Sequence, residues 1–112
     1  MVGGQDELVF DGASFALDRD GALCYQAASF AERVDLLGYQ AGAWLGGTLG
    51  TERTLEAEVY EALKTGVRDY LGKNRFPGAI IGLSGGIDSA LTLAIAVDAL
   101  GADRVRAVMM PS

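Results

Sequence analysis

Apolar residues recur at helical spacing in the middle of the chain. Leucine and valine stand at every fourth position from Leu55 to Leu71, a spacing that is typical of an amphipathic helix. Glutamates near the beginning and basic residues near the end suit the helix dipole. Pro77 then ends the segment, because proline cannot continue a helix. We expect the apolar stripe to pack in a core or in a subunit interface.

A strand–helix–strand pattern follows this helix. Residues 79–83 are almost wholly apolar, which favours a strand buried on both faces. Residues 89–100 have the character of a helix with Gly101 as its C-terminal cap, and residues 105–110 form a second apolar run. Strand, helix and strand within about thirty residues predict a βαβ unit with parallel strands.

The first part of the chain has the alternating pattern of β structure. Residues 8–10 form a short strand, and residues 14–17 and 23–27 predict a hairpin around a turn at 18–21. A single hairpin is too small to be stable alone, so we expect it to belong to a larger sheet. Five glycines within residues 38–51 then indicate a linker without regular structure.

Composition narrows the classes of protein. The chain has 112 residues, of which 50% are hydrophobic and 21% charged. It is long enough to bury one small hydrophobic core and too short to form a two-domain enzyme. The net charge of −6 argues against nucleic-acid or anionic-membrane partners. The chain has no histidine, which excludes a Ser-His-Asp triad within it. One cysteine, no long apolar run and no signal-like start predict a cytoplasmic protein without a membrane span.

The segment with the most chemistry is Ser84-Gly85-Gly86-Ile87-Asp88-Ser89, between a predicted strand and a predicted helix. Ligands of open α/β sheets bind at the carboxyl ends of strands, and a helix N-terminus favours anions. Gly85 and Gly86 let the backbone approach a phosphate, and Ser84 and Ser89 add hydroxyl donors. Asp88 would repel a bare phosphate but suits Mg²⁺ carried by one. The segment therefore predicts a phosphate site.

Spacing separates this loop from other nucleotide-binding loops. A Walker A loop needs a lysine after its glycines, and the chain has no lysine after Lys73. The GxGxxG pattern of dinucleotide-binding loops is absent as well. The SGGxDS pattern resembles the PP-loop of ATP pyrophosphatases, which cleave ATP between the α and β phosphates to adenylate a substrate. The alternative is a tight turn in which Asp88 and Ser89 merely cap the following helix.

The flanking residues narrow the resemblance. Gly82-Leu83, Ala90-Leu91 and the Val108 to Ser112 segment resemble the NAD⁺ synthetases, while Val2 to Gly12 resembles the late part of a nitrilase-type glutamine amidase domain. Glutamine-dependent NAD⁺ synthetases carry these domains in this order. The resemblance implies an α/β fold: the start of a parallel-sheet, Rossmann-like PP-loop domain of the adenine nucleotide alpha hydrolase-like type, preceded by β-hairpins of an amidase domain.

The family resemblance also implies domain limits and chemistry. The amidase domain would end with residues 1–37, and the synthetase domain would begin with residues 52–112. The glycine-rich residues 38–51 would link the two domains. The family makes NAD⁺ from deamido-NAD⁺, ATP and ammonia or glutamine through an adenylated carboxylate, with release of AMP and pyrophosphate. We expect ATP and Mg²⁺ as cofactors and a homo-oligomer. The expected ATP and pyrophosphate ligands, with Asp88 also at Mg²⁺, are Gly82, Leu83, Ser84, Gly85, Gly86, Ile87, Asp88 and Ser89.

Departures from the family limit what the chain does alone. The amidase nucleophile, lysine and glutamate lie upstream of the Val2 segment, residues 1–63 contain no lysine, and Cys24 does not match the nucleophile. We therefore expect no catalytic residue here, a chain that spans a domain junction, and no activity from these residues alone. Two alternatives stay open: another PP-loop ATP pyrophosphatase, or a phosphate-binding or structural fragment.

Overall fold

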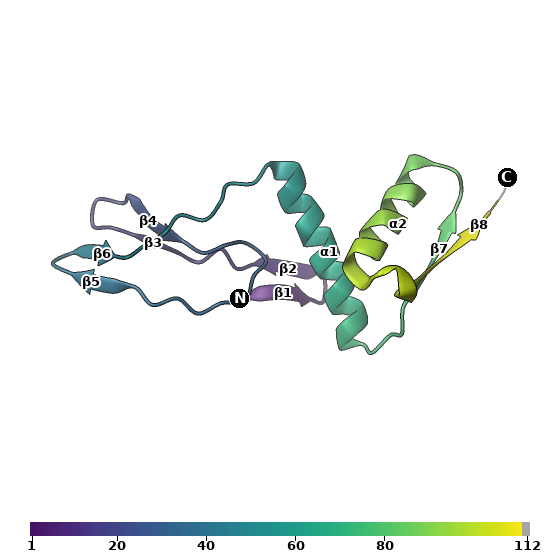
Figure 1. The fold of residues 1–112 in the computed structure, drawn as a ribbon, viewed down its shortest axis with the longest axis horizontal. Helices are drawn as coiled ribbons and strands as arrows, with labels where there is room; N and C mark the ends of the chain where they lie inside the picture. The colour runs from purple at the N-terminus through teal and green to yellow at the C-terminus, as the bar shows by residue number, and fades with distance from the viewer. Residues whose placement is uncertain (111–112) are drawn as a thin grey trace.

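The protein has an extended shape with few fully buried side chains (Figure 1). The computed structural model describes residues 1–110, so the last two residues of the Met109-Met110-Pro111-Ser112 segment lie outside the described residues. The radius of gyration is 18.7 Å, against about 13 Å for a compact domain of this length. The accessible surface is 8176 Å², against about 5,900 Å² for a compact monomer of this mass. Much apolar surface is therefore uncovered.

Two antiparallel hairpins begin the chain. β1 (Val2–Gln5) pairs with β2 (Leu8–Asp11), and β3 (Phe15–Leu17) pairs with β4 (Leu23–Gln26). The β3–β4 hairpin and its turn confirm the sequence prediction. The turn is held by Asp18, whose Oδ1 accepts the N–H groups of Asp20 and Ala22, each at 2.8 Å. Strand β1 is a strand that the sequence did not predict, because Val-Gly-Gly shows no alternation.

The prediction that residues 38–51 lack regular structure is wrong for their first half. β5 (Gly38–Gln40) and β6 (Ala43–Leu45) form a third hairpin. Its two turn residues, Ala41 and Gly42, have φ of 53° and 87°, as a type I′ turn requires. The rings of Tyr39 and Trp44 lie 4.9 Å apart, and Trp44 Nε1 donates to the Leu17 carbonyl at 2.8 Å. Cross-strand aromatic packing therefore outweighs the glycine content here.

The second half of the glycine-rich segment is packed as well. Its backbone lies against β4, and the Gln26 N–H donates to the Thr48 carbonyl at 3.0 Å. A Cβ at Gly47 would overlap the Cys24 carbonyl oxygen, and one at Gly50 would lie 3.1 Å from the Ala27 carbonyl oxygen. These glycines allow close approach of two backbones, and the segment does not behave as a flexible linker.

We expect Gly47→Ala to lower the melting temperature of the whole protein, because the added methyl group meets backbone that cannot move aside. Overpacking of this kind costs about 1–3 kcal/mol. Gly72→Ala is the matched control, since Gly72 lies in a helix with no atom within 4 Å of the added Cβ. That exchange stabilises a helix by about 0.5–1 kcal/mol. Thermal unfolding of both variants checks the prediction, and equal melting temperatures would contradict it.

Helix α1 (Leu55–Lys73) confirms the predicted helix. Thr54 caps its N-terminus by accepting the Ala57 N–H at 3.3 Å. The C-terminus closes as a Schellman motif, with Arg75 at φ 58° and the Phe76 N–H donating to the Leu71 carbonyl at 2.9 Å. The chain thus leaves the helix just before Pro77.

The apolar stripe of α1 is not packed in a core of the described residues. Leu55 is 75% exposed, and Val59 and Leu63 are about half exposed. The helix instead turns a different face to hairpin β1–β2 and to α2, between which it lies in Figure 1. Its fully buried side chain is Thr65. The sequence prediction of core packing is therefore wrong for this half of the stripe, and a subunit interface stays a prediction.

The predicted βαβ unit is present. β7 (Ala79–Leu83) and β8 (Val105–Met109) are parallel, and α2 (Ile87–Leu100) with a short 3₁₀ turn, η1 (Ala102–Arg104), connects them. Helix α2 begins two residues before the predicted start. The expected burial of β7 on both faces is wrong in the described residues, because Ile80 is 74% exposed.

The entry to the βαβ unit is held by Arg104. Its guanidinium donates to the Phe76 and Pro77 carbonyls, both at 2.9 Å. Only glycine fits at position 78, because a Cβ there would overlap the Arg104 carbonyl oxygen. These contacts place the beginning of β7 beside the beginning of β8. Among residues 1–110, no helix has the length and apolar character needed to cross a membrane.

Candidate functional site

The candidate phosphate loop, residues 84–86, connects the carboxyl end of β7 to the N-terminus of α2 (Figure 1). Gly82 and Leu83, both predicted as ligands, lie in β7 and place Met110 beside the loop. The Leu83 carbonyl accepts the Met110 N–H at 2.9 Å, and a Cβ on Gly82 would lie 2.5 Å from Met110 Cε. These two residues therefore shape the edge of the site through packing.

Hydrogen bonds within the loop set its shape. Ser89 Oγ donates to the Gly86 carbonyl at 2.9 Å and accepts the Ser84 N–H at 3.3 Å. The Ser84 hydroxyl lies 3.3 Å from the same Oγ. Gly85 has φ of 87°, a conformation that L side chains rarely adopt, so the turn depends on glycine there. The loop is folded back on the first turn of α2, with Ser84 exposed.

The N-terminus of α2 has no side-chain cap. Its N-cap residue is Gly86, whereas Thr54 caps α1. Asp88 and Ser89 lie inside the first turn of α2 and form no cap hydrogen bond, so the capping part of the alternative is wrong, whereas its tight glycine turn is present. The first N–H groups of a helix carry partial positive charge and need acceptors. An anion such as a phosphate is a suitable acceptor here.

Asp88 is an exposed carboxylate in the first turn of α2. Among the described residues, no group of three or more histidine, cysteine, aspartate or glutamate side chains is placed to hold a metal ion. Mg²⁺ usually binds through one or two carboxylates together with substrate phosphates. Asp88 therefore fits a metal ion that arrives with a nucleotide, and the described residues do not fit a protein-only metal cage.

Ile87, the remaining predicted ligand, is 79% exposed at the start of α2. Most of its side chain is therefore open to solvent in the described residues. The structure thus brings Ser84, Gly85, Gly86, Asp88 and Ser89 together in one loop and helix turn. The binding roles of all eight residues stay predictions.

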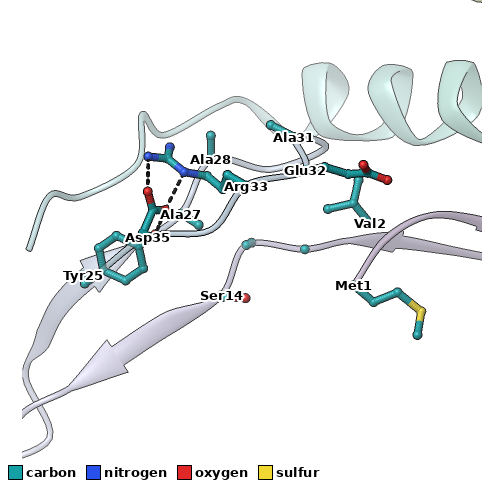
Figure 2. Close-up of a pocket in the computed structure, with 12 residues that line it drawn as sticks. Met1, Val2, Ser14, Tyr25, Ala27, Ala28, Ala31, Glu32, Arg33 and Asp35 are labelled. Carbon is teal, nitrogen blue, oxygen red and sulfur yellow. Dashed lines mark hydrogen bonds and ion pairs between the residues drawn. The ribbon is translucent and has the colours of Figure 1, made fainter. Parts of the chain in front are cut away.

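A second concave region lies far from this loop, between β1 and β4 (Figure 2). It is a cavity of about 550 Å³ that Met1, Ser14, Tyr25 and the segment around Glu32 help to line. Cys24 does not line it; this cysteine is half-buried, and its thiol lies 3.5 Å from the Ala22 carbonyl. Among the described residues, no thiol therefore lines this cavity.

Three polar side chains of this cavity, those of Tyr25, Arg33 and Asp35, bind one another. The Tyr25 hydroxyl donates to Asp35, and Arg33 donates to Asp35 Oδ1 at 2.7 Å (Figure 2). The hydrogen bond from Arg33, with that from Tyr25, holds the pKa of Asp35 below its ordinary value. The hydrogen bond to Asp35, with burial, raises the pKa of Tyr25. The cluster fastens the irregular segment 33–35 to β4. Sequence analysis missed it because no spacing signal marks a contact made by an irregular segment.

Comparisons with known proteins find NAD⁺ synthetases. The family model described as NAD synthase matches residues 59–112. A protein from Acinetobacter baylyi named glutamine-dependent NAD(+) synthetase is 49% identical over 113 residues, which cover 99% of this chain and 21% of that protein. A protein of the same name from Xanthomonas campestris is 45% identical and covers 100% of this chain. The chain spans about a fifth of the length of these curated relatives.

A solved structure has the same fold over nearly the whole chain. It is a glutamine-dependent NAD⁺ synthetase from Acinetobacter baumannii in complex with ADP, with a TM-score of 0.92 and 49% identity. The match covers 98% of this chain and 21% of that protein. The α/β arrangement with parallel β7 and β8 is therefore shared with that structure, including the hairpins that precede α1.

Proposed function

We propose that this chain, which belongs to the family of glutamine-dependent NAD⁺ synthetases, carries the ATP-binding loop of an enzyme that converts deamido-NAD⁺ to NAD⁺. The observation that supports this most is the uncapped N-terminus of α2 beneath a serine- and glycine-rich loop. Its position at the carboxyl end of parallel β7 is the usual ligand site of such sheets. A relative of the same fold binds ADP.

In this proposal the loop residues bind the β and γ phosphates of ATP. The N–H groups at the start of α2 and the Ser84 hydroxyl would donate to phosphate oxygens, and Gly85 and Gly86 leave room for them. Ser89 would donate as well by exchanging its bond to the Gly86 carbonyl for one to a phosphate oxygen. Mg²⁺, which Asp88 would help to hold, supplies charge that offsets the phosphates. The residues of this chain thereby position ATP and stabilise the pyrophosphate as it leaves.

The proposed reaction has two bond-exchange steps. The carboxylate of deamido-NAD⁺ attacks the α phosphorus of ATP, and the bond to pyrophosphate breaks. Ammonia then attacks the adenylated carbonyl, AMP leaves, and the amide of NAD⁺ forms. Glutamine is the proposed source of ammonia, as the names of the relatives indicate. No residue of the described chain is an evident general base for either step, so the role proposed for the chain is binding and orientation.

The domain limits are also proposed. Residues 1–37 would belong to the amidase part, 38–51 would join the parts and 52–112 would begin the synthetase part. The packing of Trp44 on β3 and of Gly47 on β4 supports a joining segment that moves with the amidase part. The exposed apolar residues of α1 and β7 support the view that further parts of the enzyme, or other copies of it, cover them.

The test is ATP–pyrophosphate exchange by the whole enzyme. We expect exchange only when deamido-NAD⁺ is present, and NAD⁺ formation when ammonia or glutamine is added. NAD⁺ in place of deamido-NAD⁺ is the control, because it has an amide and no carboxylate to adenylate. Residues 1–112 alone are expected to give no exchange. Exchange that does not need deamido-NAD⁺ would indicate a different member of the ATP pyrophosphatases.

A further inference from the structure

Two side chains of α1 bind the backbone of a single residue in β1. Asp69 Oδ2 accepts the Gly4 N–H at 2.7 Å, and the Lys73 ammonium donates to the Gly4 carbonyl. Lys73 also lies 3.3 Å from the Gln5 side-chain carbonyl oxygen. In two paired antiparallel strands, every second residue turns its N–H and its carbonyl away from the partner strand. Gly4 is such a residue, and α1 binds both its N–H and its carbonyl.

Glycine at three positions allows the two elements to approach. A Cβ on Gly3 would lie 2.6 Å from Asp69 Oδ2, and one on Gly4 would lie 3.4 Å from the Gly66 Cα. Gly66 of α1 allows a similarly close approach to β2, because a Cβ added there would lie 3.3 Å from a Val9 methyl group. The glycines of the Val2-Gly3-Gly4 segment therefore allow close packing against α1, where Asp69 is 65 residues further along the chain than Gly4.

The charges at this contact agree with its geometry. Burial raises the pKa of Asp69, but the hydrogen bond from Gly4 and the charges of Arg68 and Lys73 outweigh burial and hold that pKa below its ordinary value. Asp69 is therefore an ionised acceptor at neutral pH, and Lys73 is its cationic counterpart one helical turn further on. Hydrogen bonds to charged groups are the stronger kind.

The same helix packs against α2 on its other side. The Tyr60 hydroxyl donates to Asp98 at 2.7 Å, near the C-terminus of α2, and the phosphate loop precedes the N-terminus of that helix, at Ile87. Two packed helices therefore connect Gly4 to the predicted ATP site. In the proposed domain division, β1 belongs to the amidase part, and α1 and α2 belong to the synthetase part.

We propose that Asp69 and Lys73 are positioning residues for the glutamine-dependent reaction, because they hold the Val2–Gln5 strand in one register against α1. This inference rests on the proposed function. Ammonia released from glutamine has to reach the adenylated carboxylate of the other part, so its use depends on how the two parts are aligned. Ammonia from solution needs no such alignment, and its use does not depend on the contact.

The experiment measures NAD⁺ formation by the whole enzyme with glutamine and, separately, with ammonia. We expect Asp69→Ala and Lys73→Met to lower the glutamine-dependent rate about tenfold, as the loss of one charge-assisted hydrogen bond implies. The ammonia-dependent rate should change less than about twofold, a difference below 0.5 kcal/mol. More glutamate should be released per NAD⁺ formed. Lys73→Arg keeps a donor and should restore the glutamine-dependent rate.

The matched controls are Glu61→Ala and Lys64→Met, since this pair on the same helix forms a salt bridge within the helix at 2.8 Å. Both should leave the two rates and the glutamate yield unchanged. An equal fall of both rates in the Asp69 and Lys73 variants would overturn the inference, because it would indicate a general loss of fold. Unchanged rates would overturn it too. A wild-type enzyme that makes no NAD⁺ from either source would instead overturn the proposed function, and this inference with it.

Discussion

Gly85→Val in the whole enzyme is expected to lower ATP–pyrophosphate exchange about a hundredfold. The valine side chain would stand where phosphate oxygens approach the backbone of residues 84–86, and it would remove at least two hydrogen bonds to charged groups. Each such bond contributes about 1.5 kcal/mol or more, and a loss of about 3 kcal/mol from the transition state corresponds to the expected factor. The exchange rate at saturating and subsaturating ATP measures the effect.

Gly21→Val is the control that separates this effect from backbone strain. Gly21 has φ of 83° and Gly85 has φ of 87°, and a Cβ at either position has no atom within 4 Å. Both valines therefore suffer the same strain of about 1–2 kcal/mol in the same open surroundings. Gly21 lies in the turn of hairpin β3–β4, away from the loop. Equal losses of exchange in the two variants would show that strain alone, and no phosphate contact, explains the result.

The second large effect concerns the polar side chains of the same loop. Ser84→Ala is expected to slow the ammonia-dependent reaction about ten- to hundredfold, because a hydroxyl donor to a charged phosphate contributes about 1.5–3 kcal/mol. Asp88→Asn should slow it similarly and raise the Mg²⁺ concentration needed for half-maximal rate, since an amide oxygen is a weaker ligand than a carboxylate. Initial rates over a series of Mg²⁺ concentrations measure both effects.

Asp103→Asn is the matched control for Asp88→Asn. Asp103 is an exposed acid in the 3₁₀ turn at the opposite end of the βαβ unit, so its loss changes the net charge equally. Its variant should keep the wild-type rate and Mg²⁺ dependence. The melting temperature should fall little in any variant, because an acid in the first helical turn contributes only about 0.3–1 kcal/mol. Wild-type Mg²⁺ dependence in Asp88→Asn would remove this residue from the metal site.

Several elements followed from local sequence alone. The four-residue period before Pro77 predicted α1, and the apolar run 79–83 predicted β7. The loop 84–89 was located as the candidate site because its glycines, hydroxyls and carboxylate are neighbours in sequence. Periodicity, turn chemistry and capping act within a few residues, so each of them is visible in a short window. Even there the boundary of α2 was misplaced by two residues, because Ile87 and Asp88 belong to its first turn.

Other features were decided only by contacts between distant segments. Strand β1 pairs with β2 and lies against Gly66 and Asp69 of α1, while no property of the Val-Gly-Gly segment itself favours a strand. The glycine-rich segment is ordered because its backbone lies against β4. Glycine gives the same local signal whether it provides freedom or close approach, and only the neighbouring atoms decide between them. The exposure of the α1 stripe has the same origin, since a pattern shows which face is apolar and the tertiary structure decides what covers it.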